Sequence, residues 1–297
     1  MSQKIPFVKV NGCGNDFVLI DRSRLTPPQV ERMDRGLDAG LAEWLCDRRR
    51  GIGADGVLLL DSADHGWSAQ IVNADGSDGG MCGNGLRCIA LYLLNRGDAS
   101  AREPIPVAMG GRVTELRIER EEPFHASLNL GTVQLDHISG TRPVQQKDLE
   151  ALNAMFVGSV SGIAWVGNPH AAILLRDLPG PGEGSVPQAI RNSGLFPDGV
   201  NVTVAVLVDR GRLRAMTDER GVGPTQACAS GAAALVAIMH QAGIVDATCE
   251  VEMPGGSLSV GLSQDPQNPK NYLARIRGGA EFAFQGEIPI SAPKSTA

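Results

Sequence analysis

Two cysteines stand in similar surroundings, each directly before an apolar run that ends at a glycine. Cys82 begins the stretch CGNGLRC (82–88), and Cys228 begins CASG (228–231). The same spacing of 146 positions relates the two cysteines, the glycines three residues after them, and the glycines that end the apolar runs. The pattern predicts a helix of about four turns that begins at a cysteine, ends at a C′ glycine and occurs twice.

A cysteine in the first turn of a helix is placed for acid–base chemistry. Unpaired backbone N–H groups and the positive end of the helix dipole favour the thiolate, so we expect the pKa of Cys82 and Cys228 to fall below the free value of about 8.5. The same N–H groups can bind a carboxylate. Two facing thiols would suit proton removal and return at a carbon beside a carboxylate, with inversion at that carbon.

Other catalytic machinery is not indicated. None of the five lysines lies in a glycine-rich phosphate loop of the kind that a pyridoxal enzyme would need. The five histidines have no metal-ligand spacing and there is no C-x-x-C motif. We therefore expect no cofactor and no metal. The remaining four cysteines are interpreted as small core residues: Cys13, Cys46, Cys88 and Cys249.

Length and charge limit the classes of protein to consider. A chain of 297 residues suits two domains, and a net charge of −6 gives no basic field for nucleic acid. Six scattered cysteines do not form a disulfide framework, and no apolar segment suits export or membrane insertion. We expect a soluble, cytoplasmic protein that binds neither nucleic acid nor membrane.

The duplication extends beyond the cysteines. Residues 14–15 (GN) match 167–168, and 55–57 (DGV) match 198–200, in the same order as the cysteine segments. These matches argue for two structurally related halves. Strand patterns outnumber helices, with one apolar helix in each half. The predicted fold class is therefore α+β, built twice.

Several motifs together resemble the diaminopimelate epimerase family. In chain order they are GCGNDF (12–17), NADGS (73–77), MCGNGLRC (81–88), GNPH (167–170) and ERGVGPTQAC (219–228). The resemblance implies two pseudo-symmetric domains, each a barrel-like, mostly antiparallel sheet around a central helix. Their expected ranges are 1–127, completed by a C-terminal strand in 279–297, and 128–278. It also implies a homodimer that needs no cofactor and interconverts LL- and meso-diaminopimelate.

The resemblance also assigns roles to residues. Cys82 and Cys228 would be the acid–base pair, with His170 and Glu219 supporting the reacting centre. Backbone N–H groups at the start of each cysteine helix would hold the reacting carboxylate, and polar side chains would hold the other substrate groups. The first set is Gly83, Asn84, Ala229 and Ser230; the second is Asn15, Asn73, Asn168, Asn201, Glu219 and Arg220.

Some positions depart from the family pattern and leave the substrate open. Ala229 replaces a usual glycine, Pro224 a usual glutamate, and Gly56 a glutamine found in some members, while residues 277–279 (RGG) replace a more usual TGP. One alternative is a racemase or epimerase of another amino acid, of the histidine or proline type. Another is a non-catalytic amino-acid-binding protein, although a pure binder needs neither thiol.

Overall fold

The protein is described here from a computed structural model. The structure describes residues 4–38, 40–139, 143–156, 159–178 and 186–289. The chain divides into two compact units, one made of Met1–Ser127 with Gly279–Ala297 and the other of Leu128–Gly278. Within the described residues, no helix is long and apolar enough to cross a membrane.

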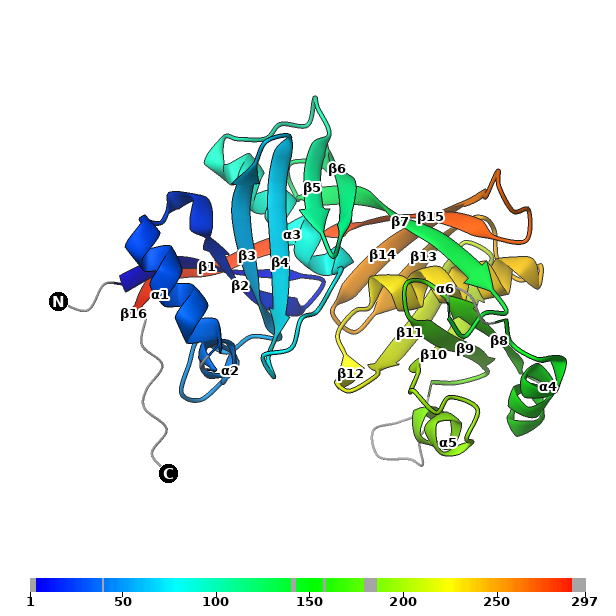
Figure 1. The fold of residues 1–297 in the computed structure, drawn as a ribbon. Helices are drawn as coiled ribbons and strands as arrows, with labels where there is room; N and C mark the ends of the chain where they lie inside the picture. Colours follow the sequence, from blue (N-terminus) through cyan, green and yellow to red (C-terminus); the bar gives the residue numbers. More distant parts are fainter. Residues whose placement is uncertain (1–3, 39, 140–142, 157–158, 179–185, 290–297) are drawn as a thin grey trace. The chain divides into compact units, whose positions relative to one another are not determined.

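The first unit is a curved sheet around one helix. Its strands are hydrogen-bonded in the order β6-β5-β4-β3-β2-β1-β16. Figure 1 shows the last strand, β16, returning from the far end of the chain to lie beside β1. The bounds are β1 Lys4–Gly12, β2 Asn15–Asp21, β3 Gly56–Ala63, β4 Gly66–Asn73, β5 Ile105–Met109, β6 Arg112–Arg120 and β16 Glu281–Pro289.

The second unit is a closed barrel. Its strands follow the order β7-β8-β9-β10-β11-β13-β14-β15, and a further pairing of β15 with β7 closes the ring. The short strand β12 (Gly223–Thr225) pairs with β11 alone. The other bounds are β7 His125–Leu135, β8 Val160–Trp165, β9 Pro169–Leu175, β10 Asn201–Asp209, β11 Arg212–Glu219, β13 Thr248–Met253, β14 Gly256–Gln264 and β15 Tyr272–Gly279.

The strand directions repeat between the units. In the first, β1–β2 is antiparallel, β2–β3 parallel, β3–β4 antiparallel, β4–β5 parallel and β5–β6 antiparallel. In the second, the series from β8–β9 to β13–β14 has the same alternation. In both, the fourth and fifth strands of the series are separated in sequence by the cysteine helix. The fold class predicted from the sequence is confirmed.

The two cysteine helices have matching ends. They are α3 (Gly83–Arg96) and α6 (Ala229–Gln241), with Cys82 and Cys228 as their N-caps. The φ and ψ angles are −128° and 105° at Cys82, and −129° and 110° at Cys228. Each helix ends in two nested backbone hydrogen bonds that enclose a glycine with positive φ. This glycine is Gly97 after α3 and Gly243 after α6. The predicted repeated helix is confirmed.

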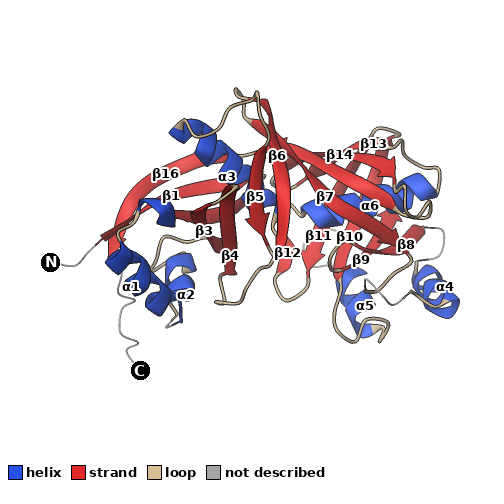
Figure 2. Cartoon of the chain, turned by 45° about the horizontal axis from the view of Figure 1, so that its top comes forward, coloured by secondary structure: helices blue, strands red, loops and turns tan. Residues whose placement is uncertain are grey.

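Peripheral helices cover the outer face of each sheet, as the ribbon coloured by secondary structure shows (Figure 2). Apolar residues of α1 and α2 pack on β1–β3, while α4 and α5 pack on β8–β10. Strands β3 and β10 are therefore buried on both faces, because α3 and α6 lie against their other sides. The bounds are α1 Pro27–Asp38, α2 Leu41–Cys46, α4 Gln146–Met155 and α5 Val186–Asn192, with a 3₁₀ turn η1 at Arg22–Arg24.

Candidate active site

The residues singled out from the sequence lie at one end of each sheet, where the cysteine helix begins. In the first unit they stand where β2 starts, where β4 ends and in the first turn of α3. In the second unit they stand where β9 and β10 start, where β11 ends and in the first turn of α6. We call these two groups the N-terminal half-site and the C-terminal half-site. Each is described within its own unit.

Cys82 begins the N-terminal half-site. Its Sγ accepts a hydrogen bond of 3.3 Å from the N–H of Gly85, so the thiol itself caps the helix. Its own N–H donates to the sulfur of Met109 at 3.4 Å. Gly83 and Asn84 follow as the first two helical residues, positions whose N–H groups have no acceptor inside the helix. This geometry suits both a thiolate and a carboxylate.

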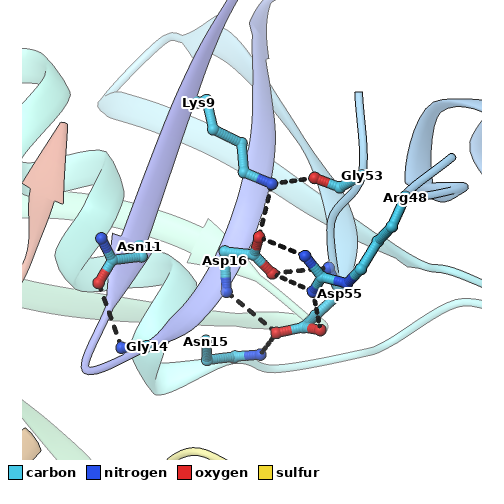
Figure 3. A network of polar contacts seen from close by, with 8 residues as sticks. All are labelled: Lys9, Asn11, Gly14, Asn15, Asp16, Arg48, Gly53 and Asp55. Atoms are coloured by element: carbon cyan, nitrogen blue, oxygen red, sulfur yellow. Dashed lines mark hydrogen bonds and ion pairs between the residues drawn. The ribbon is translucent and has the colours of Figure 1, made fainter. Parts of the chain in front are cut away.

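Two asparagines are joined beside this helix start. Asn84 Nδ2 donates to Asn15 Oδ1 at 3.2 Å, and Asn15 Nδ2 donates to a carboxylate oxygen of Asp55 at 2.8 Å. Asp55 also accepts from Arg48 at 2.8 Å, which ties this pair of amides to an ion-pair network (Figure 3). The structure therefore brings Cys82, Asn84 and Asn15 into one connected group.

The charged groups of the ion-pair network next to Asn15 are paired with one another. Asp16 accepts two hydrogen bonds from Arg48, at 2.7 and 3.0 Å, and one from Lys9 at 2.6 Å (Figure 3). Burial raises the pKa of Asp16, but the hydrogen bonds from Arg48 and Lys9 outweigh it and hold that pKa at about 2. Asp16 is therefore a carboxylate at neutral pH, and the network fixes the start of β2.

Asn73 lies at the end of β4, opposite Gly56 in the register of the sheet. Its Nδ2 donates to Ser77 Oγ at 3.0 Å, and its backbone N–H donates to Ser77 O at 2.8 Å. These bonds hold Asn73 in the 73–77 turn. A Cβ at Gly56 would lie 2.9 Å from Val72 O, so the glutamine of some family members does not fit this backbone.

Cys228 begins the C-terminal half-site in the same way. Its Sγ accepts a hydrogen bond of 3.3 Å from the N–H of Gly231 and lies 3.5 Å from Ser230 Oγ. Ala229 and Ser230 are the first two residues of α6, and Ala229 is buried. Glu219, at the end of β11, accepts from Thr225 Oγ1 at 2.7 Å.

The expected lowering of the thiol pKa is wrong for Cys228. Burial and then the negative charge of Glu219 raise the pKa of this thiol, and the Ser230 and Gly231 hydrogen bonds offset only part of the rise. The sequence pattern predicted that Cys228 lies at a helix end. It did not predict the burial of this thiol or its closeness to the Glu219 carboxylate. Cys228 consequently holds its proton at neutral pH.

His170 and Asn168 form a hydrogen-bonded pair at the start of β9. His170 is fully buried, and its Nε2 lies 2.7 Å from Asn168 Oδ1. Burial and then the charge of Arg220 lower the pKa of His170 to about 3. His170 is therefore neutral at physiological pH and cannot serve there as a cationic acid.

Asn201 and Arg220 are joined through the backbone. Asn201 Oδ1 accepts from the Arg220 N–H at 2.8 Å, and Asn201 Nδ2 donates to Pro169 O at 3.3 Å. The exposed Arg220 side chain donates from Nη1 to Asp198 O at 3.0 Å. Asn201 thus holds the turn that carries Arg220, while most of the guanidinium remains available to a ligand.

The glycines at the third residue of each helix are required by packing. A Cβ at Gly85 would lie 2.8 Å from Leu58 Cδ2 of β3. A Cβ at Gly231 would lie 2.8 Å from Thr203 Oγ1 of β10 and 3.0 Å from Thr217 Oγ1. Both helices therefore approach the equivalent strand closely, which brings each cysteine to the end of its sheet.

Three residues of these half-sites were not singled out from the sequence. Asp55 fixes Asn15, Thr225 fixes Glu219, and the buried Arg87 donates to Asn84 Oδ1 at 2.8 Å. Asp55 belonged to a repeated DGV segment, and Arg87 to the CGNGLRC stretch. Neither the DGV segment nor the CGNGLRC stretch indicates which neighbour a side chain contacts.

Comparison with known proteins agrees with this architecture. Solved structures with the same fold include a hydroxyproline epimerase from Agrobacterium vitis, with a TM-score of 0.67, 15% identity, and coverage of 97% of this chain and 92% of that chain. A PhzF-family phenazine biosynthesis protein from Bacillus anthracis matches with a TM-score of 0.68 and 13% identity, over 96% of this chain and 99% of that one. At such identities the likeness concerns the fold alone.

Sequence relatives define the class and then the family. A diaminopimelate epimerase from Xanthomonas axonopodis pv. citri is 33% identical over 96% of this chain and 97% of its own length. One from Rhizorhabdus wittichii is 34% identical over 97% of each. Together with the two-fold repeated site, these matches make the protein an enzyme of the amino-acid epimerase class. The family model for diaminopimelate epimerase matches residues 7–135 and 163–277, and the chain belongs to the diaminopimelate epimerase family.

Proposed function

We propose that this enzyme interconverts LL- and meso-diaminopimelate by two-base proton transfer at Cα, with Cys82 and Cys228 as the two bases. The observation that carries the proposal is the repeated helix start. Each thiol caps its helix with the same backbone angles and accepts a 3.3 Å hydrogen bond from the glycine three residues on. A reaction that treats the two faces of one carbon alike needs two such groups.

The proton transfers balance without any other reactant. One cysteine, as thiolate, takes the Cα proton, and the electron pair of the C–H bond moves into the adjoining carboxylate. The other cysteine, as thiol, gives its proton to the opposite face of the same carbon. The raised pKa of Cys228 suits it to hold a proton for donation before substrate binds. In the reverse direction the roles exchange.

The remaining residues would bind the substrate. The N–H groups of Gly83, Asn84, Ala229 and Ser230 would hold the reacting carboxylate and stabilise its growing charge. Glu219 and the neutral His170 would support the reacting centre. The other polar groups of the substrate would be held by four side-chain amides and one guanidinium, those of Asn15, Asn73, Asn168, Asn201 and Arg220.

Arg220 is the feature that favours diaminopimelate over a smaller amino acid. Diaminopimelate has a second carboxylate, and an exposed planar guanidinium can bind it in bidentate fashion. The alternative is an epimerase or racemase of a histidine- or proline-type amino acid. Ala229 leaves this alternative open, because its methyl group stands in the first helical position, where the family usually has glycine.

Substrate identity is tested by direct comparison. Purified enzyme is incubated with LL-diaminopimelate, proline, 4-hydroxyproline or histidine, and the stereoisomers are separated by chiral chromatography. We expect the highest kcat/KM with diaminopimelate. A higher value with a monocarboxylic amino acid would establish the alternative. A role in lysine and cell-wall precursor synthesis, a cytoplasmic location and a homodimeric state accompany the proposal and depend on the family resemblance.

A further inference from the structure

The buried cation Arg87 is unusual in its surroundings. Its side chain is fully buried, and within the described part of the chain it forms no ion pair with a carboxylate. Its donors instead reach an amide oxygen, two carbonyl oxygens and a sulfur: Asn84 Oδ1 at 2.8 Å, Gly83 O at 3.2 Å, Gly279 O at 3.4 Å and Cys13 Sγ at 3.7 Å. Burial of an arginine without a counter-ion is costly, so a specific function is expected of it.

The contact with Asn84 begins a chain of three hydrogen bonds. Arg87 donates to Asn84, Asn84 donates to Asn15, and Asn15 donates to Asp55, over 2.8, 3.2 and 2.8 Å. Arginine can only donate, and an ionised carboxylate can only accept. Every bond in the chain must therefore point the same way, from Arg87 towards Asp55.

Asp55, at the acceptor end of this chain of hydrogen bonds, is itself held in place. Besides Asn15 Nδ2, it accepts from the N–H of Asp16 at 3.0 Å and from Arg48 at 2.8 Å (Figure 3). The local charges of Lys9 and Arg48 are matched by those of the two aspartates. The positive charge of Arg87 has no carboxylate partner among the described residues.

We propose that Arg87 is a positioning residue that, together with Asp55, fixes the direction of the Asn84 and Asn15 amides in the N-terminal half-site. An asparagine amide alone can be rotated by 180° with little change in shape, which exchanges its donor and its acceptor. With Arg87 at one end and Asp55 at the other, each amide has one orientation. The half-site thereby presents a defined pattern of donors to the carboxylate of an amino-acid substrate.

The C-terminal half-site lacks the arginine and the helix asparagine of this arrangement. The helix position that corresponds to Arg87 is Ala233, and the position that corresponds to Asn84 is Ser230. Near Cys228 the neighbouring charge is the carboxylate of Glu219. The two half-sites therefore repeat the thiol and the helix end, but they differ in the charged group beside the helix start, which is the buried Arg87 in one and the half-buried Glu219 in the other.

The proposal is tested by coupling between its two ends, Arg87 and Asp55, which are not hydrogen-bonded to each other among the described contacts. Arg87→Met removes the donor-only end, and Asp55→Asn removes the acceptor-only end. Each single variant keeps the other end, which still sets the direction of both amides, so we expect KM for LL-diaminopimelate to rise by no more than about threefold, with a smaller change in kcat. The double variant frees both amides, and its KM should rise by clearly more than the product of the two single changes. A rise equal to that product would mean independent effects and would overturn the proposal.

Controls separate positioning from folding. Arg87→Lys keeps the charge and a donor, and should recover part of the KM loss. Arg117→Met, at an exposed arginine of β6, should leave KM unchanged. Thermal unfolding of each variant is measured alongside, so that a fall in folded protein is not read as a loss of binding.

A second measurement does not need activity, since the KM test rests on the proposed function. In ¹H–¹⁵N spectra of side-chain amides, Arg87→Met should shift the resonances of Asn15 as well as Asn84, because Arg87 is linked to Asn15 through the Asn84 amide. The Asn73 amide, bonded to Ser77, should not move. If the Asn15 resonance does not move, the proposed chain of hydrogen bonds from Arg87 to Asp55 is wrong. Inactivity of the wild type on diaminopimelate, with the Asn15 shift present, would overturn only the proposed function.

Discussion

His170 Nε2 lies 2.7 Å from Oδ1 of Asn168, so the tautomer of the histidine follows from the orientation of this amide. Because an amide oxygen can only accept, Nε2 must carry the proton. His170 Nδ1 is then an acceptor, and it has no partner among the described residues. Protonation of Nδ1 would create a buried cation beside Arg220, which explains the pKa of about 3.

This histidine makes stability depend on pH. Its pKa falls from 6.5 in the unfolded chain to about 3 in the folded one, so between these values the unfolded chain binds one more proton. The free energy of unfolding should therefore decrease as pH falls from 6.5 towards 3, by up to about 1.4 kcal/mol per pH unit. In urea unfolding at pH 4–7, His170→Gln should show a slope smaller by that amount. Parallel curves for the two proteins would contradict a buried neutral histidine.

Gly231→Ala tests the close approach of α6 to its sheet. The new methyl group would lie 2.8 Å from Thr203 Oγ1 and disturb the 2.9 Å Thr203–Thr217 hydrogen bond. Overpacking of this kind costs about 2–3 kcal/mol, and the better helix propensity of alanine returns about 1 kcal/mol. We expect a net loss of about 1–2 kcal/mol in the free energy of unfolding.

The matched control is Gly261→Ala. Among the described residues, leaving aside its two chain neighbours, no heavy atom lies within 4 Å of a Cβ built at Gly261 in β14, so this change should not reduce stability. Urea unfolding measures both variants. Equal stability of Gly231→Ala and the wild type would show that the helix does not need glycine at this position.

Arg220→Ala tests the distal carboxylate of the substrate. Loss of a charge-assisted contact should cost about 2–5 kcal/mol, which lowers kcat/KM for diaminopimelate by well over tenfold. Arg220→Lys should restore only part of it, since an ammonium cannot form the bidentate pair. Arg214→Ala, at an exposed arginine that pairs with Glu252, is the control. A change within about 1 kcal/mol in Arg220→Ala would make Arg220 an ordinary surface residue.

Repeated local signals explain why much of the fold could be predicted from the sequence. The terminal glycines Gly97 and Gly243 have positive φ, so both helix ends follow from residue type, and the repeated cysteine with a glycine three residues on marks both helix starts. The strand segments follow from apolar runs such as 57–60. The resemblance assigned roles to the polar residues, and the structure shows them at one end of each sheet.

Contacts between distant segments could not be predicted in this way. The pKa of Cys228 depends on Glu219, which the fold brings back to the helix start, and on burial among neighbours from other strands. The direction of the Asn15 amide depends on Asp55, forty residues later in the chain. Neither residue type nor spacing determines which of several polar groups a side chain contacts, because tertiary packing decides it.

The origin of the proton that arrives at Cα tests the two-base mechanism most directly. LL-diaminopimelate is incubated in heavy water, and early samples are separated into remaining substrate and meso product for mass spectrometry. With Cys82 and Cys228 on opposite faces, the product should carry one solvent deuteron at Cα while the remaining substrate carries none. Cys82→Ala and Cys228→Ala should each abolish product formation while retaining the fold. Product that keeps the original proton, or full turnover by either single variant, would contradict the account.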